Sequence, residues 1–379
     1  MHFIAPTVRT QLPAVQRRVL VQSFVSSRAA HDLAVTLSGK PVVAHGPGGR
    51  SSRSGYVATV FGATGFIGRY LTSRLAKNGT IVVTPYREEI AKRFLKVTGD
   101  LGVVNFVEFD LRNLQSIEDA VKNSDIVYNL IGREYSTKLF DYYDINVEAT
   151  RRIANAVAKY NVDRFIQVSS YNASPDSTSE FWRTKYEAEQ VAKEIVPHAT
   201  IVRPAPVIGW EDRVVRRIIG WPHFTVNEGQ NTFQPVHVED LVSALHKIGF
   251  DDSTTGKTYE LFGPDVTSWR QLIRACEREA FKEYKTFNIP KSVYASVSDA
   301  LNKVLWWPVG SADQVERLSQ DQVVPKHSLT FADLGIKPQR YNEYVGTYVK
   351  YLRSNLFQDV ESGSLAESKR EREFIHVAR

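Results

Sequence analysis

A glycine-rich turn between an apolar strand and an amphipathic helix constrains the fold of this chain more than any other feature. The stretch "YVATVFGATGFIGRYL" places Gly62, Gly65 and Gly68 after a short apolar run and before apolar residues at helical spacing. Glycines there allow a tight turn, close approach of the backbone to a pyrophosphate, and close packing of helix on sheet. The motif predicts a dinucleotide-binding unit, although its Gly-x-x-Gly-x-x-Gly spacing is also compatible with a purely structural turn.

Strand-like and helical segments alternate after this turn. Further apolar runs cover residues 80–86, 103–110, 124–132, 163–170 and 199–209, and helical patterns separate them. Such alternation is typical of a parallel sheet with helices on both faces. We therefore predict an α/β fold with a Rossmann-type, doubly wound parallel sheet.

The pattern loosens beyond about residue 211, where a smaller mixed α/β C-terminal lobe is expected. Strands are predicted within 231–238 and 256–263, and helices within 239–250, 267–280 and 291–305. The predicted organisation is a dinucleotide-binding domain at 56–210 and a lobe at 211–353 that is interleaved with it. Residues 32–55 should form an extended segment without its own core, and residues 354–379 a polar tail.

The first 31 residues have the composition of a mitochondrial presequence. They contain four arginines and no acidic residue, and they are rich in Ser, Thr, Ala and Val. A cytosolic tail is the alternative. Removing four of the six net positive charges leaves +2 on the rest of the chain, so a nucleic-acid surface is not expected.

Bulk properties exclude several classes of protein. The chain has a single cysteine, Cys276, which rules out an internal disulfide and a cysteine-based metal site. No run of eighteen apolar residues predicts a membrane span, and no His/Asp/Glu cluster has metal-ligand spacing. His237 could act as a ligand or base, but a histidine at the start of a helix is more often structural.

The end of the second strand bears on the choice of cofactor. Where an acidic residue would bind the ribose hydroxyls of NAD, this chain has Tyr86 and Arg87. A guanidinium suits a 2′-phosphate, which favours NADP(H). Alternatively, Arg87 pairs with the adjacent Glu88 or Glu89 at the start of a helix.

Further strand ends converge on the same predicted site. Asp110 could accept from the adenine amino group or could instead cap the next helix, and Asn129 could simply end a strand. The full set of expected cofactor-binding residues is Gly62, Thr64, Gly65, Phe66, Ile67, Gly68, Tyr86, Arg87, Asp110, Leu111, Leu130, Ile131, Gly132, Ser169, Ser170, Lys185 and Pro204.

Several of these motifs occur in the order seen in the extended and atypical short-chain dehydrogenase/reductase superfamily. They are "FGATGFIGRYL", "FDLRNLQS", "NLIG", "FIQVSS" and "VRPAPVIG". More specifically, "GGRSSRSG" before the turn, "PYR", "GDLG" at 99–102, "NLIGREY" and "FGPD" resemble the NADPH-binding accessory subunits of mitochondrial respiratory complex I. The resemblance covers nearly the whole domain and weakens after about residue 265.

This resemblance implies a subunit that binds NADPH tightly and carries no redox step. It also implies a place on the matrix side of the inner membrane, near the junction of the peripheral and membrane arms, with other complex I subunits as partners instead of a free homo-oligomer.

The predicted active-site helix supports that implication. The superfamily's reaction uses a tyrosine four residues before a lysine as its general acid/base, and this chain has Phe181 before Lys185. Ser169 and Ser170 could still polarise a carbonyl, and Lys185 could bond the nicotinamide ribose or lie solvated beside Glu189. Tyr171 is the one residue that could replace the missing hydroxyl.

We therefore predict a non-catalytic, NADPH-binding accessory subunit. An active mitochondrial NADP-dependent reductase or epimerase is the main alternative, and a nucleotide-sensing regulator is the third. One segment stays open: residues 291–307, with Trp306 and Trp307 at the end, fit either core packing or a helix that contacts a partner or the membrane surface.

Overall fold

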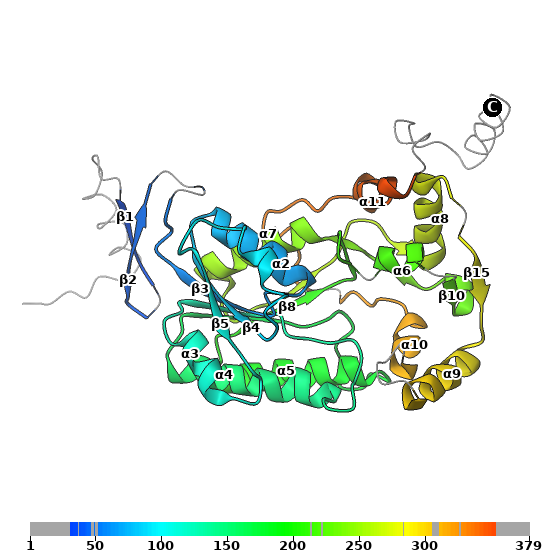
Figure 1. Cartoon of the computed structure of the whole chain (residues 1–379), viewed down its shortest axis with the longest axis horizontal. Coiled ribbons are helices and arrows are strands. Elements are labelled where there is room, and N and C mark those ends of the chain that lie inside the picture. The colour runs from blue at the N-terminus through cyan, green and yellow to red at the C-terminus, as the bar shows by residue number, and fades with distance from the viewer. Residues whose placement is uncertain are drawn as a thin grey trace, which may run out of the picture.

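A computed structural model describes residues 31–353, apart from residues 37, 47–48, 50–51, 213, 221–222, 283, 305–310 and 326. A seven-stranded sheet lies at its centre, and all of its neighbouring strands pair in parallel (Figure 1). The strands in spatial order are β13 (Thr258–Leu261), β8 (Thr200–Pro204), β7 (Arg164–Val168), β6 (Ile126–Asn129), β3 (Val57–Phe61), β4 (Ile81–Tyr86) and β5 (Val104–Glu108).

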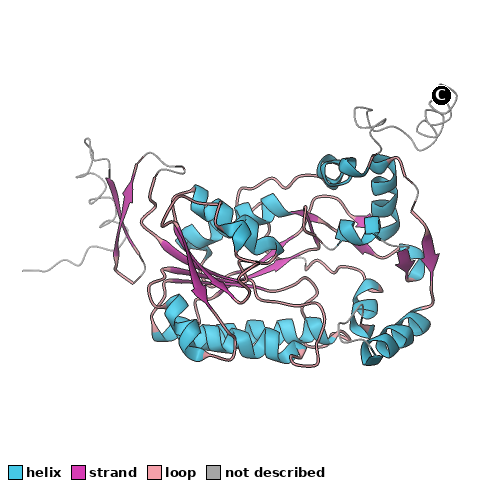
Figure 2. Ribbon diagram, viewed as in Figure 1, coloured by secondary structure: helices cyan, strands magenta, loops and turns pink. Residues whose placement is uncertain are grey.

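Two layers of helices cover this sheet, because its central strands are apolar on both faces (Figure 2). On one face lie α3 (Leu114–Val121), α4 (Ala149–Lys159) and α5 (Glu180–Ile195). On the other face lie α2 (Phe66–Lys77) and α7 (Val238–Phe250), which pack against each other. The two hydrophobic cores on either side of the sheet thus follow from the continuous apolar runs of the sequence.

The C-terminal lobe has its own core. Three helices supply most of it: α6 (Val214–Gly220), α8 (Trp269–Ala280) and α11 (Tyr341–Val349). A second helical pair, α9 (Lys291–Val304) and α10 (Ala312–Leu318), packs below it. Short strand pairs complete the lobe: β9 (Val207–Ile208) with β12 (Val236–His237), β10 (His223–Thr225) with β15 (Thr286–Asn288), and β11 (Thr232–Phe233) with β14 (Thr267–Ser268).

Short helical turns occupy several connections. They are η1 (Arg93–Leu95), η3 (Asn227–Gly229), η4 (Asp252–Thr254) and η5 (Lys350–Leu352), with a π-helical turn η2 (Asp144–Glu148) leading into α4.

The predicted α/β class and the parallel sheet are confirmed, and differences lie in the details. Within residues 32–55 the structure contains a two-stranded hairpin, β1 (His31–Val35) and β2 (Pro41–His45), where an extended segment was expected. β13 pairs with β8 in the main sheet, and α7 packs on α2, although both elements were expected in the C-terminal lobe. The run at 231–238 forms two short strands, because Gln234 and Pro235 interrupt it.

Three short helices, α6, α10 and α11, had no sequence prediction. The predicted presequence, apart from His31, and the polar tail fall outside the described residues, as do Trp306 and Trp307. The domain boundaries themselves stay predictions.

A buried ionic cluster ties α5 to the sheet. The Arg203 guanidinium on β8 donates to both carboxylate oxygens of Glu189, at 2.9 and 2.7 Å, and to Glu260 on β13 at 3.1 Å. Glu189 is almost completely buried. Removing one partner from such a cluster leaves a charge poorly compensated, which costs far more than removing an exposed pair.

We therefore expect Glu189→Ala to lower the free energy of unfolding by about 3–5 kcal/mol. The matched control is Glu118→Ala, which breaks the exposed Glu118–Lys159 pair and should cost less than about 1 kcal/mol. Urea unfolding of the purified chain measures both. Equal losses in the two variants would show that the Arg203 cluster does not anchor α5.

Candidate cofactor-binding cleft

A cleft of about 440 Å³ opens at the carboxyl ends of the parallel strands. It lies at the point where the chain order reverses between β3 and β6, which is where open α/β sheets bind ligands. Eleven of the predicted residues line it, from the glycine turn, the ends of β6, β7 and β8, and α5: Gly62, Gly65, Phe66, Ile67, Gly68, Leu130, Gly132, Ser169, Ser170, Lys185 and Pro204.

Six predicted residues do not line this cleft: Thr64, Tyr86, Arg87, Asp110, Leu111 and Ile131. Arg87 follows β4 with an exposed side chain, and its guanidinium lies 3.2 Å from Glu88. The local ion pair that the sequence left open as an alternative is therefore present. Asp110 is not the cap of α3: it accepts from the Arg112 N–H, and Asn113 caps the helix by accepting from Gln115.

The glycine turn has the geometry that the motif predicts. Gly62 has φ of +80°, in the left-handed region that favours glycine. A Cβ on Gly68 would lie 2.2 Å from the Gly62 carbonyl oxygen, so α2 can pack this close only with glycine. A Cβ on Gly65 would meet only that same oxygen, at 3.2 Å, and Gly65 faces the cleft. The turn thus leaves open space where a pyrophosphate would approach the N-terminus of α2.

Lys185 is the most perturbed cation of the cleft. Its side chain is buried, and Nζ donates to the Ile131 carbonyl at 3.2 Å beside Gly132. Burial lowers the pKa of Lys185 to about 8, although Glu189 one turn away opposes this shift. The solvated-lysine alternative is therefore wrong, and the binding of ribose hydroxyls by this ammonium stays a prediction.

Phe181 lies in the same wall, one turn before Lys185. Its ring centroid is 5.9 Å from Lys185 Nζ. Phe181 has no hydroxyl to donate, so this position cannot transfer a proton. Ser169 Oγ is buried in the cleft without a hydrogen-bond partner among the described residues, which leaves it available to a ligand.

Tyr171 also lines the cleft. Its ring packs against Trp182 at 5.6 Å, and burial raises the pKa of its hydroxyl to about 12. A hydroxyl with a raised pKa is a poor base at neutral pH, which weakens Tyr171 as a substitute for the missing tyrosine.

The far wall of the cleft consists of residues that were not predicted from the sequence. This wall combines Arg133 from the loop after β6 with an arginine, amides and apolar or aromatic side chains of the C-terminal lobe: Asn231, Phe233, Trp269, Gln314, Arg317, Leu318, Gln320 and Gln322. Most of these residues lie beyond the predicted Rossmann segments, in stretches without a motif. Among the charged residues of the lining, the cations Arg133, Lys185 and Arg317 outnumber the anions Glu134 and Glu211. The lining thus carries a net positive charge, which suits a phosphate-bearing ligand.

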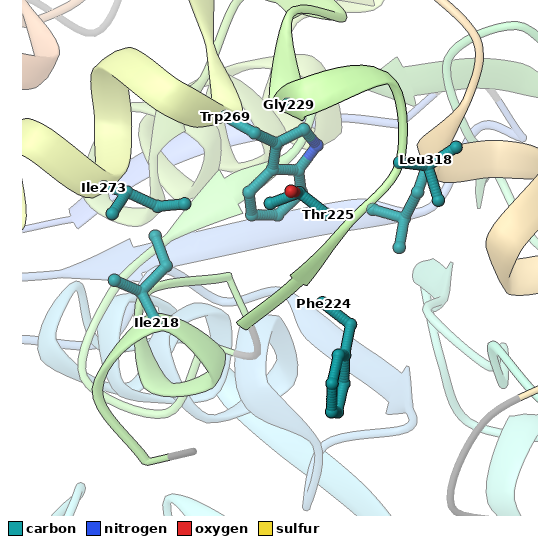
Figure 3. Close-up of a pocket in the computed structure, with 8 residues that line it drawn as sticks. Ile218, Phe224, Thr225, Gly229, Trp269, Ile273 and Leu318 are labelled. Atoms are coloured by element: carbon teal, nitrogen blue, oxygen red, sulfur yellow. The ribbon is translucent and has the colours of Figure 1, made fainter. Parts of the chain in front are cut away.

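A second, much smaller cavity lies behind that wall (Figure 3). Its volume is about 30 Å³, enough for little more than a water molecule, and its lining is mostly apolar. Leu318 and Trp269 border both spaces. This cavity is too small for an organic ligand.

Other candidate residues are structural. His237 Nε2 lies 2.7 Å from the Tyr348 hydroxyl, and its ring stacks on Tyr344, away from the cleft lining. Within the described ranges no His, Cys, Asp and Glu side chains gather as a metal site would require. None of the helices described is both long and apolar enough to cross a bilayer.

The amino-acid sequence of this chain is similar to those of several known proteins. Residues 58–261 match the NAD dependent epimerase/dehydratase family. The chain is 47% identical over 351 residues to the mitochondrial NADH-ubiquinone oxidoreductase 40 kDa subunit of Neurospora crassa, covering 92% of this chain and 93% of that protein. It is 37% identical to the mitochondrial NADH dehydrogenase [ubiquinone] 1 alpha subcomplex subunit 9 of Mus musculus, covering 78% and 80%.

The fold also resembles solved epimerase structures. The UDP-glucuronic acid 4-epimerase of Bacillus cereus, solved with UDP-glucuronic acid and NAD, superimposes with a TM-score of 0.60 at 17% identity. The match covers 78% of this chain and 99% of that one. At this identity the likeness concerns the fold alone.

Two glycine substitutions should separate cofactor binding from folding. Gly65→Val places a side chain on the cleft side of the turn and should abolish NADPH binding, at a stability cost smaller than that of Gly68→Ala, because its Cβ would lie 3.2 Å from the Gly62 oxygen instead of 2.2 Å. Gly68→Ala forces α2 from the turn and should cost about 2–3 kcal/mol. Fluorescence titration with NADPH and thermal unfolding measure the two effects. Wild-type binding by Gly65→Val, or wild-type stability of Gly68→Ala, would contradict this geometry.

Burial of Lys185 predicts a pH dependence. The folded cofactor-free chain releases this proton near pH 8, whereas the unfolded chain holds it up to about the ordinary value of 10.5. The unfolded state therefore binds more protons in this window, and the free energy of unfolding should rise with pH from about 8 to 10.5.

Lys185→Met should remove that rise, and the gap between the two proteins should change by up to about 3 kcal/mol across the window. Urea unfolding of both cofactor-free proteins at a series of pH values tests this. Parallel stability curves for wild type and Lys185→Met would refute it.

Proposed function

This chain belongs to the NAD dependent epimerase/dehydratase family and, within it, to the mitochondrial NADH-ubiquinone oxidoreductase subunits of the 40 kDa type, and from this premise we propose that it is a non-catalytic accessory subunit of respiratory complex I. In this role it binds NADPH tightly as a structural cofactor and supports assembly and stability of the complex. Its partners are other subunits of that complex.

The proposal that the chain is not itself an enzyme rests on Phe181, which has no hydroxyl group. The cleft keeps the binding elements of the family, namely the glycine turn, the serines after β7 and the buried Lys185. It lacks a proton donor where the superfamily's chemistry requires one, and Tyr171 is held against Trp182. A site that binds the cofactor without a general acid/base holds the cofactor and does not turn it over.

The choice of NADPH over NADH rests on Arg87. Its side chain is exposed at the end of β4, and its present partner is the equally exposed Glu88. Exchanging this weak pair for a 2′-phosphate costs little, because exposed ion pairs contribute about 0–1 kcal/mol. Arg87, which lies outside the cleft lining at the end of β4, would then exchange Glu88 for the 2′-phosphate of the bound cofactor. When bound, NADPH would supply a nicotinamide and a 2′-phosphate, and this chain's residues would supply only contacts.

The proposed location is the matrix side of the mitochondrial inner membrane, within the complex near the junction of its two arms. The basic, acid-free first 31 residues and the mitochondrial names of the relatives support import. Peripheral contact with the membrane remains a prediction for residues 291–307.

An active NADP-dependent reductase or epimerase is the alternative, because the family's fold is an enzymatic one. The two functions differ in their response to Phe181→Tyr. As an accessory subunit, this variant should assemble normally and gain no reductase activity.

The test follows the chain in mitochondria whose own copy has been deleted. We expect wild type to appear in the large complex on native gels and to yield about one NADPH per chain on extraction. Arg87→Asp should weaken NADPH binding by about 1.5–3 kcal/mol, since it removes a charge-assisted bond and adds repulsion. Its complex should contain less NADPH.

Three results would overturn the proposal. They are full assembly of active complex without this chain, extraction of mainly NADH from wild type, and a soluble reductase activity that disappears with the chain. Glu88→Gln is the matched control: it frees Arg87 from its local partner without removing the guanidinium, so NADPH content should stay unchanged.

A further inference from the structure

We propose that Arg317 is a positioning residue that holds α10 closed over the nicotinamide half of the cleft and so retains the bound cofactor. The proposal rests on the proposed function, because it concerns how the same site keeps NADPH. It goes beyond that function by assigning retention to a helix of the C-terminal lobe, which has no place in the glycine-turn motif.

The short helix α10 is fastened to the N-terminus of α5. Asp313 Oδ1 accepts from the Ser179 hydroxyl at 2.9 Å and from the Glu180 N–H at 2.7 Å. A carboxylate at a helix N-terminus is stabilised by the free N–H groups there. Asp313 thus acts as a cap for α5 from a segment more than 130 residues away along the chain.

A second set of bonds holds the other end of α10. Thr178 Oγ1 donates to Glu316 at 2.9 Å and accepts from the Gln320 amide at 2.6 Å. Beyond the helix, the Val323 N–H donates to the Asn172 side chain at 2.8 Å, and the Asn172 amide donates to the Asp321 carbonyl at 2.9 Å. The segment from residue 313 to 323 is therefore tied along its length to the loop after β7 and to the start of α5.

Arg317 is the point where this segment meets the cleft. Its Nη2 donates to the Glu134 carbonyl at 2.6 Å, two residues after Gly132. Its guanidinium carbon lies 4.4 Å from the centroid of the Phe181 ring, within range of a cation–π contact. Its Nε lies 3.2 Å from Asp313 Oδ2, without hydrogen-bond alignment. One side chain therefore joins α10, the loop after β6 and the ring beside Lys185.

The contact with Arg317 suggests a role for the Phe181 ring. The same ring has Lys185 Nζ at 5.9 Å and the Arg317 guanidinium at 4.4 Å. In an active relative the residue at this position would turn a hydroxyl toward a substrate. Here the ring is the platform on which an arginine of the C-terminal lobe rests, so the approach to the nicotinamide half is covered by protein.

The side chains of α10 that line the cleft fit a role in retaining the bound cofactor. Gln314, Arg317 and Leu318 of α10 line the cleft together with the glycine turn and Lys185. Leu318 also borders the small apolar cavity, across which lie Ile218 and Ile273 of the lobe's core (Figure 3). For a cofactor to leave past this side, α10 would have to lift and expose both Leu318 and the Arg317 contacts.

The test measures how fast bound NADPH leaves the full chain. Protein loaded with NADPH is mixed with excess NADP⁺, and loss of the bound-NADPH fluorescence gives the dissociation rate. We expect Arg317→Ala to accelerate release about tenfold or more, since it removes a charged hydrogen bond and a cation–π contact. Arg317→Lys keeps the charge but loses the planar fork, so it should restore part of the retention.

Arg340→Ala is the matched control, because Arg340 is an exposed arginine of the same lobe, paired with Asp265 and absent from the cleft lining. It should release NADPH at the wild-type rate. Thr178→Val loosens α10 without touching Arg317 and should accelerate release by a smaller factor, which keeps the test decisive if Arg317→Ala fails to fold.

Wild-type release by Arg317→Ala, or by Thr178→Val where Arg317→Ala does not fold, would overturn the retention role of Arg317 while leaving the proposed function standing. A lower melting temperature of Arg317→Ala with an unchanged release rate would also overturn it, because the Arg317 contacts would then serve only the fold. Absence of NADPH binding in wild type would instead overturn the proposed function, and the retention role with it.

Discussion

The close contact between Gly68 and the carbonyl of Gly62 is the constraint on which the rest of the cleft depends. It seats the first turn of α2 directly on the end of β3, so that the helix N-terminus points into the opening at the strand ends. Every other binding element is placed relative to this turn by the parallel sheet: the loop after β6 lies next to it, then the serines after β7. A single methyl group at residue 68 would disturb this order, because its neighbours are backbone atoms that cannot give way.

The positive charge of Lys185 in the cleft is poorly compensated by the protein alone. Lys185 is buried with a carbonyl partner, and burial lowers the pKa of its ammonium to about 8. A phosphate-bearing cofactor close by would favour the charged form again. The neighbouring Arg203 has no such need, since two carboxylates already satisfy it. The contrast between these two cations supports the proposed binding role of Lys185 and a structural role for Arg203.

The first domain could be predicted from the sequence because its signals are local. Apolar runs, a glycine turn and helical periodicity each act within about fifteen residues, and the order of the strand ends follows from the parallel topology. The far wall could not be predicted in this way. Arg317 meets Glu134 and Phe181 across more than 130 residues of chain, and α10 is a helix of seven residues with no periodicity to detect. The membership of β13 in the main sheet was missed for the same reason: its partner β8 lies more than fifty residues earlier.

The proposed absence of a catalytic hydroxyl and the proposed cover over the Phe181 ring are physically compatible with each other. A reductase must open on the substrate side at each turnover, so strong contacts across that side would slow its product release. A chain that only holds its cofactor has no such restriction. There, a contact that slows dissociation more than it slows association lowers Kd, and a ligand bound only by the folded state stabilises it by RT ln(1 + [L]/Kd), about 4 kcal/mol at a thousandfold excess over Kd. Phe181 bears on both points. It has no hydroxyl that could donate a proton, and its ring face contacts the Arg317 guanidinium. Binding without turnover and retention by α10 are therefore two proposals consistent with one role, in which the cofactor stabilises the fold that contacts its partner subunits.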